Sequence, residues 1–174
     1  PLIKEIEAHL KDIGDVRVVS TNFSFRNEDM TSRLMDPNRA GGSLLDVGVY
    51  DLHFTKMILK KEPIFISGVA SMDTDEHHLQ VDEQAAWIAQ YDKGELGLMC
   101  SSIRTDMIDT AYIYGTKGHM VIPQFWKPWQ LQLTVGDKTE VIERPVPQKM
   151  AGIEDEGYQF EIAHVNQCIR DGIK

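Results

Sequence analysis

Three tight turns between short apolar stretches restrict this chain to a sheet built largely from antiparallel hairpins. Residues 80–91 and 95–104 are rich in β-forming side chains and flank Asp92-Lys93-Gly94. Turns this short join antiparallel neighbours, because a parallel pair needs a crossover of a dozen or more residues. Two further pairs follow the same pattern: 110–114 with 119–123 around residues 115–118, and 130–135 with 138–143 around Gly136-Asp137.

The remaining apolar segments predict helices and two more strands. Apolar residues recur at helical spacing in three places, and glycine or proline follows each of them as a stop signal. The order of elements predicts an α+β fold, with one large, mainly antiparallel, open-faced sheet and helices packed on one face. The predicted helices are 2–13, 43–59 and 157–172, and the other predicted strands are 16–25 and 64–72.

The residues of one predicted strand indicate that the open face of the sheet is covered by a second subunit. A sheet that faces water on one side shows clean alternation of apolar and polar residues. The strand within 80–91 is bulky or apolar on both sides, with Val81, Ala85, Trp87 and Tyr91 on one face and Ala86 and Ile88 on the other.

Length, charge and hydropathy limit the classes of function that this chain can have. The 174 residues suit one domain, although the chain opens without methionine inside a helical pattern, so we expect a piece of a longer protein. A net charge of -9 excludes a basic field for nucleic acid. No apolar run reaches the roughly 18 residues of a membrane span. Two cysteines far apart in sequence, Cys100 and Cys168, predict reduced thiols and a cytoplasmic location.

An acid and a phenol stand four residues apart in the apolar segment GGSLLDVGVYDLHF. At 3.6 residues per turn, Asp46 and Tyr50 of a helix point the same way, and His53 continues the stripe. An acid in apolar surroundings costs a few kcal/mol unless it is paired, and such a cost is typical of functional sites. Alternatively, Asp46 accepts backbone hydrogen bonds and Tyr50 points to solvent. Gly48 in mid-helix indicates a bulky neighbour or a ligand against the helix.

Candidate metal ligands are sparse. His164 and Cys168 lie four apart on the last predicted helix, with Glu161 on the same stripe, a spacing that can hold zinc. A buried cysteine and a locally hydrogen-bonded histidine are the commoner explanation, so we predict no metal site. The adjacent His77 and His78 would face opposite sides of a strand and cannot easily share an ion.

Several segments, taken in order, resemble one enzyme family. GGSLLDVGVYDLHF, the preceding DPNRAGG, the hairpin VDEQAAWIAQYDKGELGLMCSSI, IYGTKGHMVIP and the closing GYQFEIAHVNQCIRDG are similar to the second domain of the glucose-fructose oxidoreductase/inositol dehydrogenase/rhizopine-catabolism (Gfo/Idh/MocA) family. The resemblance covers nearly the whole chain. It looks closest to the dimeric dihydrodiol dehydrogenases and related sugar dehydrogenases, which have a tyrosine where inositol dehydrogenases have histidine.

The resemblance implies the substrate-binding and oligomerisation half of a two-domain dehydrogenase. The other half would be a Rossmann domain that binds NAD or NADP and carries a lysine in a Glu-Lys-Pro motif; no such motif is present here. The family's acid and tyrosine correspond to Asp46 and Tyr50, which we predict to be catalytic.

The neighbouring residues complete the expected site. We predict His53, Arg33 and Arg39 as substrate contacts, although loop arginines are often simply solvated, and the Gly41-Gly42 backbone as an approach to the cofactor. The implied partners are a sugar, polyol or diol substrate and a second copy of the chain bound through the open sheet face. A non-catalytic dimerisation module with the same fold, and a metal-dependent hydrolase using His164, Cys168 and Glu161, are the alternatives.

Overall fold

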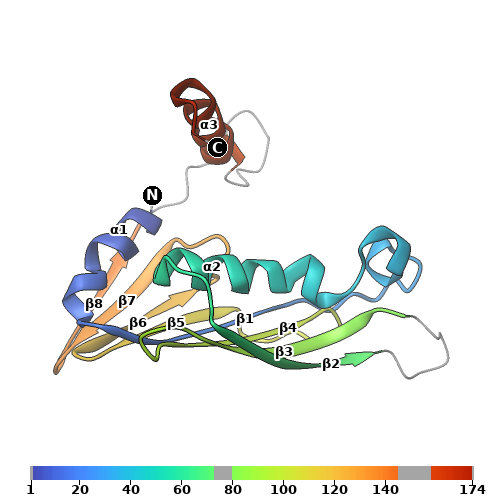
Figure 1. The fold of residues 1–174 in the computed structure, drawn as a ribbon, viewed down its shortest axis with the longest axis horizontal. Helices are drawn as coiled ribbons and strands as arrows, with labels where there is room; N and C mark the ends of the chain where they lie inside the picture. The colour runs from blue at the N-terminus through green and yellow to red at the C-terminus, as the bar shows by residue number, and fades with distance from the viewer. Residues whose placement is uncertain (1, 73–79, 145–157, 174) are drawn as a thin grey trace.

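The computed structural model describes residues 2–72, 80–144 and 158–173. It contains one eight-stranded sheet with helices along one face (Figure 1). The strands are β1 Val16–Ser24, β2 Phe65–Met72, β3 Asp82–Gln90, β4 Leu96–Ser102, β5 Thr110–Gly115, β6 Gly118–Pro123, β7 Gln130–Val135 and β8 Lys138–Glu143. The helices are α1 Leu2–His9, α2 Val49–Leu59 and α3 Tyr158–Asp171, with short helical turns η1 Leu10–Ile13, η2 Arg33–Met35, η3 Pro37–Arg39 and η4 Leu44–Gly48.

The sheet has the order β2-β3-β4-β1-β5-β6-β7-β8. The three predicted hairpins, β3–β4, β5–β6 and β7–β8, are confirmed, as is the α+β class with a mainly antiparallel open sheet. The exception is β1, which pairs with β4 in parallel, from Val18 opposite Leu96 to Ser24 opposite Ser102. Parallel neighbours need a crossover, and here the chain between them contains α2, β2 and β3.

The two faces of the sheet differ in what covers them. Val19, Thr21 and Phe23 of β1 are buried on the face that carries α1 and α2. On the opposite face, no described helix covers the sheet, and Ile88 of β3 and Leu98 of β4 are 47% and 39% exposed. The prediction that β3 has bulk on both sides is therefore confirmed.

The predicted helix over 43–59 is not a continuous α-helix. Residues Leu44–Gly48 form a π turn, η4, and the α-helical geometry starts at Val49. Three leucines of this segment do not pack into the core: Leu44, Leu45 and Leu52 are 44%, 61% and 39% exposed. π turns that interrupt helices are frequent at functional sites.

Gly48 lies where η4 passes closest to the sheet. A Cβ atom there would stand 2.9 Å from Cη2 of Trp87 and 3.1 Å from Oγ of Ser101. The bulky neighbour that a mid-helix glycine predicts is therefore Trp87 of β3.

We expect Gly48→Ala to destabilise the protein. Alanine favours a helix over glycine by about 1 kcal/mol, but overpacking against Trp87 and Ser101 costs about 1–3 kcal/mol. Chemical denaturation measures the net loss. Adding Trp87→Phe removes the atoms of the indole ring that lie nearest to residue 48. The free energy of unfolding should therefore fall less in the double variant than the sum of its decreases in the two single variants. Strictly additive losses would show that Trp87 is not the obstacle.

The last helix differs from the first two. The predicted helix is confirmed as α3, but none of its described residues is buried, and Figure 1 draws it apart from the sheet. The predicted packing of helices on one face is confirmed in α1 and α2, whereas the described residues of α3 make no buried contact with the sheet. No helix among the described residues is long and apolar enough to cross a membrane. His77-His78 and residues 145–157 lie outside the described residues.

Candidate active site

An acid at the start of β3 holds the beginning of the η4–α2 segment. Oδ2 of Asp82 accepts hydrogen bonds from Oγ of Ser43 at 2.8 Å and from the backbone N–H of Leu44 at 2.7 Å. Ser43 Oγ also lies 3.1 Å from Oγ of Ser101 on β4. A carboxylate on the first free N–H groups of a helix satisfies them and favours the positive end of the helix dipole. The sheet thereby positions the helix that carries the candidate catalytic residues.

Gly41 and Gly42 are buried where the preceding loop meets this helix start. A Cβ atom on Gly41 would collide with the backbone oxygen of Leu34, and one on Gly42 would collide with Oδ1 of Asp82. Gly42 also has φ +105°, which favours glycine. Within the chain, the two glycines thus permit close packing of the loop. Their contact with a cofactor stays a prediction.

The structure brings two of the predicted site residues together. Arg33 of η2 donates from Nη2 to Oδ1 of Asp46, and this ion pair joins the loop to the π turn. The Asp46 side chain is 19% exposed and that of Arg33 is 46% exposed. Arg39 lies on η3 and is exposed, and His53 is exposed on α2. Their roles as substrate contacts stay predictions.

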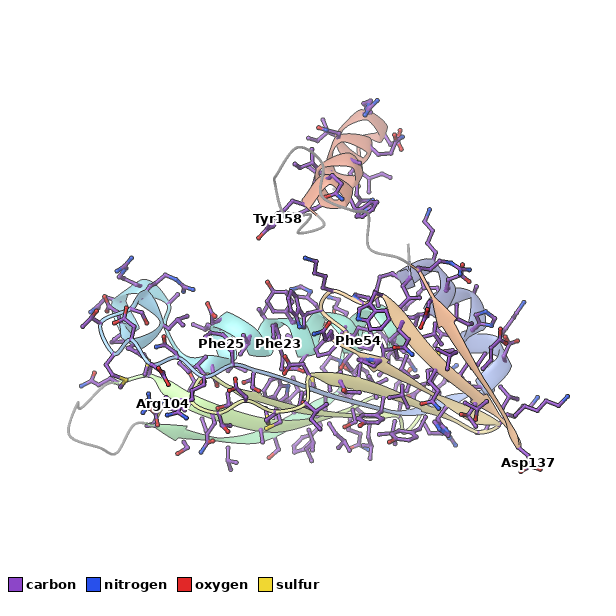
Figure 2. All side chains as sticks on the ribbon, turned by 180° about the vertical axis from the view of Figure 1, so that it is seen from behind. Phe23, Phe25, Phe54, Arg104, Asp137 and Tyr158 are labelled. Atoms are coloured by element: carbon purple, nitrogen blue, oxygen red, sulfur yellow. The ribbon has the colours of Figure 1, made fainter. Side chains whose placement is uncertain are left out.

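Tyr50 is open to solvent and borders an aromatic surface that the sequence did not predict. Its ring meets Phe23 edge-on, with centroids 5.2 Å apart, and Phe23 stacks on Trp126 at 5.4 Å with 9° between the planes. Tyr50 and Trp126 are 46% and 40% exposed. Figure 2 shows Phe23 on the side of the sheet that carries α2. We call the exposed rings of Tyr50 and Trp126, together with the buried Phe23 ring that contacts both, the aromatic surface. Trp126 follows β6, so its proximity depends on the folded sheet.

The fully buried acid of this helix is Asp51 rather than Asp46. Asp51 is 0% exposed, and neither of its carboxyl oxygens has a hydrogen-bond partner of ordinary geometry. Burial raises the pKa of Asp51 to about 8, with a smaller upward contribution from the charge of Asp109 and a partial downward one from the Thr21 hydroxyl. The sequence does contain a signal for this burial, because Asp51 lies on the same helical face as the core residues Phe54 and Ile58.

The residues proposed for zinc contact each other on α3. Cys168 Sγ lies 3.6 Å from Nε2 of His164. Over the ranges that the structure describes, no group of three or more His, Cys, Asp or Glu side chains is placed to hold a metal ion. Cys100 and Cys168 are both free thiols.

The family comparison matches residues 8–121, which include the sheet centre, η4 and α2, to the GFO/IDH/MocA C-terminal domain. The chain belongs to this family. Among curated proteins, a trans-1,2-dihydrobenzene-1,2-diol dehydrogenase of Mus musculus is 33% identical over 163 residues, covering 93% of this chain and 47% of the relative. The Homo sapiens enzyme of the same name is 32% identical over 166 residues, with the same coverage. The chain therefore spans about half the length of these relatives.

Solved structures of this GFO/IDH/MocA fold agree with the architecture. An aldose-aldose oxidoreductase from Caulobacter crescentus, complexed with glycerol, superposes with a TM-score of 0.80 at 21% identity, over 99% of this chain and 50% of that one. An inositol dehydrogenase homolog from Azotobacter vinelandii, complexed with NAD+, gives a TM-score of 0.70 at 22% identity, over 89% and 44% of the two chains. The relatives and the structural neighbours are thus oxidoreductases.

Proposed function

We propose that this chain is the substrate-binding and dimerisation domain of an NAD(P)-dependent oxidoreductase that acts on a hydroxyl or carbonyl group of a sugar, polyol or dihydrodiol. The observation that carries the proposal is that one helical segment presents an exposed phenol, Tyr50, four residues after a carboxylate, Asp46, that is ion-paired with Arg33. The names of the relatives and structural neighbours support the reaction class and the kind of substrate.

The two side chains have separate roles in such a reaction. A pyridine nucleotide supplies the hydride acceptor when it is bound, and the substrate hydroxyl must lose its proton to a base. In this proposal Tyr50 takes that proton, and a cation near the phenol, which favours the phenolate form, would come from the nucleotide-binding part of the enzyme. Asp46, which is held in place by its ion pair with Arg33, can accept a hydrogen bond from the substrate hydroxyl and orient it.

The aromatic surface supports a substrate with an apolar face. Phe23 and Trp126 lie beside Tyr50 in a stacked pair, and Trp126 is partly exposed. Aromatic rings pack against the C–H face of a sugar ring or against another unsaturated ring. A polyhydroxylated ring or a ring diol would therefore lie on this surface with one hydroxyl at Tyr50.

The outer side of the same helix supports a neighbouring domain. Leu44, Leu45 and Leu52 are exposed together along η4 and α2, and contiguous apolar surface of this kind usually marks an interface. The residues of this chain can line one side of a nucleotide site, whereas a glycine-rich pyrophosphate loop would come from elsewhere.

Reconstitution tests this assignment. The chain alone should bind NAD(P)H weakly and show no turnover. Joined to an NAD(P)-binding domain, it should reduce NAD(P)+ in the presence of a polyol or a ring diol. Absence of dehydrogenase activity across a substrate panel, in a protein that binds the nucleotide, would favour a non-catalytic module.

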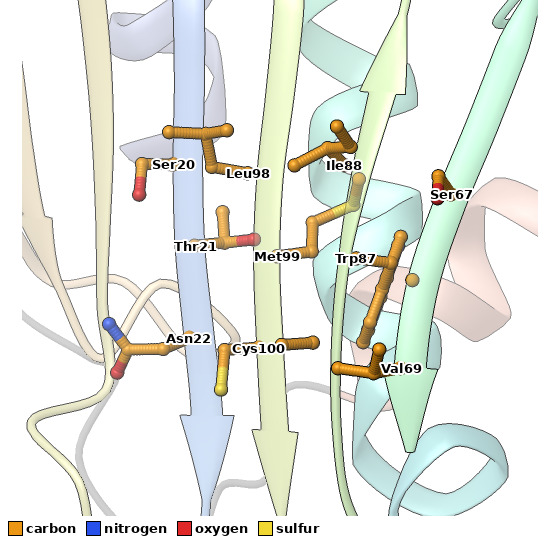
Figure 3. Close-up of a pocket in the computed structure, with 12 residues that line it drawn as sticks. Ser20, Thr21, Asn22, Ser67, Val69, Trp87, Ile88, Leu98, Met99 and Cys100 are labelled. Atoms are coloured by element: carbon orange, nitrogen blue, oxygen red, sulfur yellow. The ribbon is translucent and has the colours of Figure 1, made fainter.

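The uncovered face of the sheet supports the dimerisation role. A hollow of about 430 Å³ lies on this face, away from Tyr50, and Figure 3 shows it in front of the strands with α2 behind them. We assign the hollow to subunit contact rather than to the reaction, because apolar side chains surround it along successive strands. Residues of this face include Val69 of β2, Ile88 of β3, Leu96 and Leu98 of β4, Tyr112 and Tyr114 of β5, and Val141 of β8.

We expect Leu98→Glu to convert a homodimer into a monomer. In an isologous interface the change places two charges in the buried contact, and an unpaired buried charge costs several kcal/mol. Size-exclusion chromatography with light scattering measures the mass. Ile108→Glu is the matched control, because Ile108 is 83% exposed in the loop before β5. A Leu98→Glu protein with unchanged dimer mass would exclude this face as the interface.

A further inference from the structure

Three buried polar side chains lie where α2 packs on the sheet. Asp51 and Thr55 lie one turn apart on α2 and are each 0% exposed, and Thr21 of β1 is 2% exposed. The carboxyl oxygens of Asp51 and the hydroxyl oxygens of both threonines have no hydrogen-bond partner of ordinary geometry. Buried polar groups are normally satisfied, so a group of four such atoms in one interface requires a reason.

The charges around this cluster favour an uncharged carboxyl. The titratable groups that interact electrostatically with Asp51 are Asp109, before β5, and Cys100 of β4, and neither is a cation. Oδ1 of Asp109 accepts a hydrogen bond from the backbone N–H of Ser24 at 2.9 Å. A buried acid facing another acid and no cation retains its proton more tightly. A protonated carboxyl can both donate to and accept from the two threonine hydroxyls.

The cluster is connected to Tyr50 through both elements. On α2, Asp51 directly follows Tyr50 in the chain. On β1, Thr21 and Phe23 lie on the same face, and the Phe23 ring contacts Tyr50 with centroids 5.2 Å apart. Two adjacent contacts between the same helix and strand fix the rotation of the helix, because one residue of an α-helix corresponds to about 100°.

We propose that Asp51 is a positioning residue for the reaction of this domain: with Thr21 and Thr55, its buried carboxyl sets the rotation of α2 on β1 and thereby holds Tyr50 against Phe23. The catalytic part of this inference rests on the proposed function. The structural part, the state of Asp51 and the placement of Tyr50, stands without it. Ionisation of Asp51 would leave an unpaired charge in the interface, which loosens α2 and displaces Tyr50.

Spectroscopy on the protein tests the structural part. At neutral pH we expect an infrared band of a protonated carboxyl that Asp51→Asn removes and Asp137→Asn, at an exposed turn, leaves unchanged. Nuclear Overhauser effects between the Tyr50 and Phe23 rings should persist in Asp51→Asn and disappear in Asp51→Ala, with the sheet still folded by circular dichroism. Unchanged Overhauser effects between these rings in Asp51→Ala would overturn the proposal.

Kinetics on the protein joined to its nucleotide-binding domain test the catalytic part. Asp51→Ala should lower kcat about tenfold or more with KM within about twofold, because a displaced base changes the chemical step more than binding. Asp51→Asn should retain kcat. We expect kcat of the wild type to decline at alkaline pH, where Asp51 ionises, and Asp51→Asn should not show this decline. The wild type, Asp51→Asn and Asp51→Ala could have equal kcat even though the Tyr50 ring has moved away from Phe23 in Asp51→Ala. That result would refute the catalytic role of Tyr50, but not its placement by Asp51.

Discussion

Replacing Tyr50 with phenylalanine is expected to lower kcat by about 10²-fold or more, the usual scale for losing a general acid–base group. Phenylalanine keeps the ring, so the edge-on contact with Phe23 and the fold should be unchanged. The loss therefore reports the phenol oxygen alone. If the proposed function holds, steady-state kinetics of NAD(P)+ reduction, with this domain joined to a nucleotide-binding domain, measure the loss.

The matched control for this variant is Tyr114→Phe. Tyr114 has a similar exposure, 41% against 46%, and its ring also contacts another aromatic ring, that of Tyr112. It lies on the opposite face of the sheet, in the proposed subunit contact, so its phenol should not affect kcat as long as light scattering shows an unchanged dimer mass. If Tyr50→Phe keeps activity within about twofold of the wild type, the phenol has no acid–base role.

The stability of the protein should fall as the pH rises from about 4 to about 8, because of Asp51. The pKa of Asp51 is about 8 in the folded protein and about 4 when the chain is unfolded, so the folded state binds the proton more tightly. Stability from this group is complete below the unfolded pKa, decreases through the interval, and decreases no further above the folded pKa. The full difference is on the order of several kcal/mol.

Urea denaturation at a series of pH values measures this dependence. Asp51→Asn has no titrating proton at this position, so its unfolding free energy should be nearly flat where the wild type declines. Other acids contribute their own slopes, and Asp137→Asn controls for an exposed acid. A wild-type curve parallel to that of Asp51→Asn would mean that Asp51 is ionised when folded.

The sequence predicted the parts of the fold that are encoded locally. Turns such as Asp92-Lys93-Gly94 determine their hairpins within a few residues, and Gly14, with φ +78°, ends the first helical segment as its pattern indicates. The parallel pairing of β1 with β4 has no local signal, because the partners are separated by the whole crossover. The π turn was missed since its residues fit the α-helical spacing equally well.

The candidate site was predictable to a similar extent. Asp46 and Tyr50 came from a contiguous segment, and the contact of Arg33 with Asp46 was within reach because both lie near that segment. Asp82 and Trp126 reach the site from distant strands and turns, so only the folded sheet brings them there. The burial of Asp51 could have been predicted from its position on the helix. Because nearly every face of the segment is apolar, however, the sequence did not show which of its acids faces the core.

The parallel pairing in the middle of the sheet affects the order in which the chain can assemble. Val18 finds its neighbour Leu96 only after 77 intervening residues have been synthesised, and β5 on its other side emerges later still. During translation β1 therefore has no partner strand until β4 has been synthesised. Closing the long segment between β1 and β4 also makes this pairing slower to form than a local hairpin. Nascent chains stalled just before β4 should accordingly be more sensitive to protease and bind chaperones more than chains released after β6.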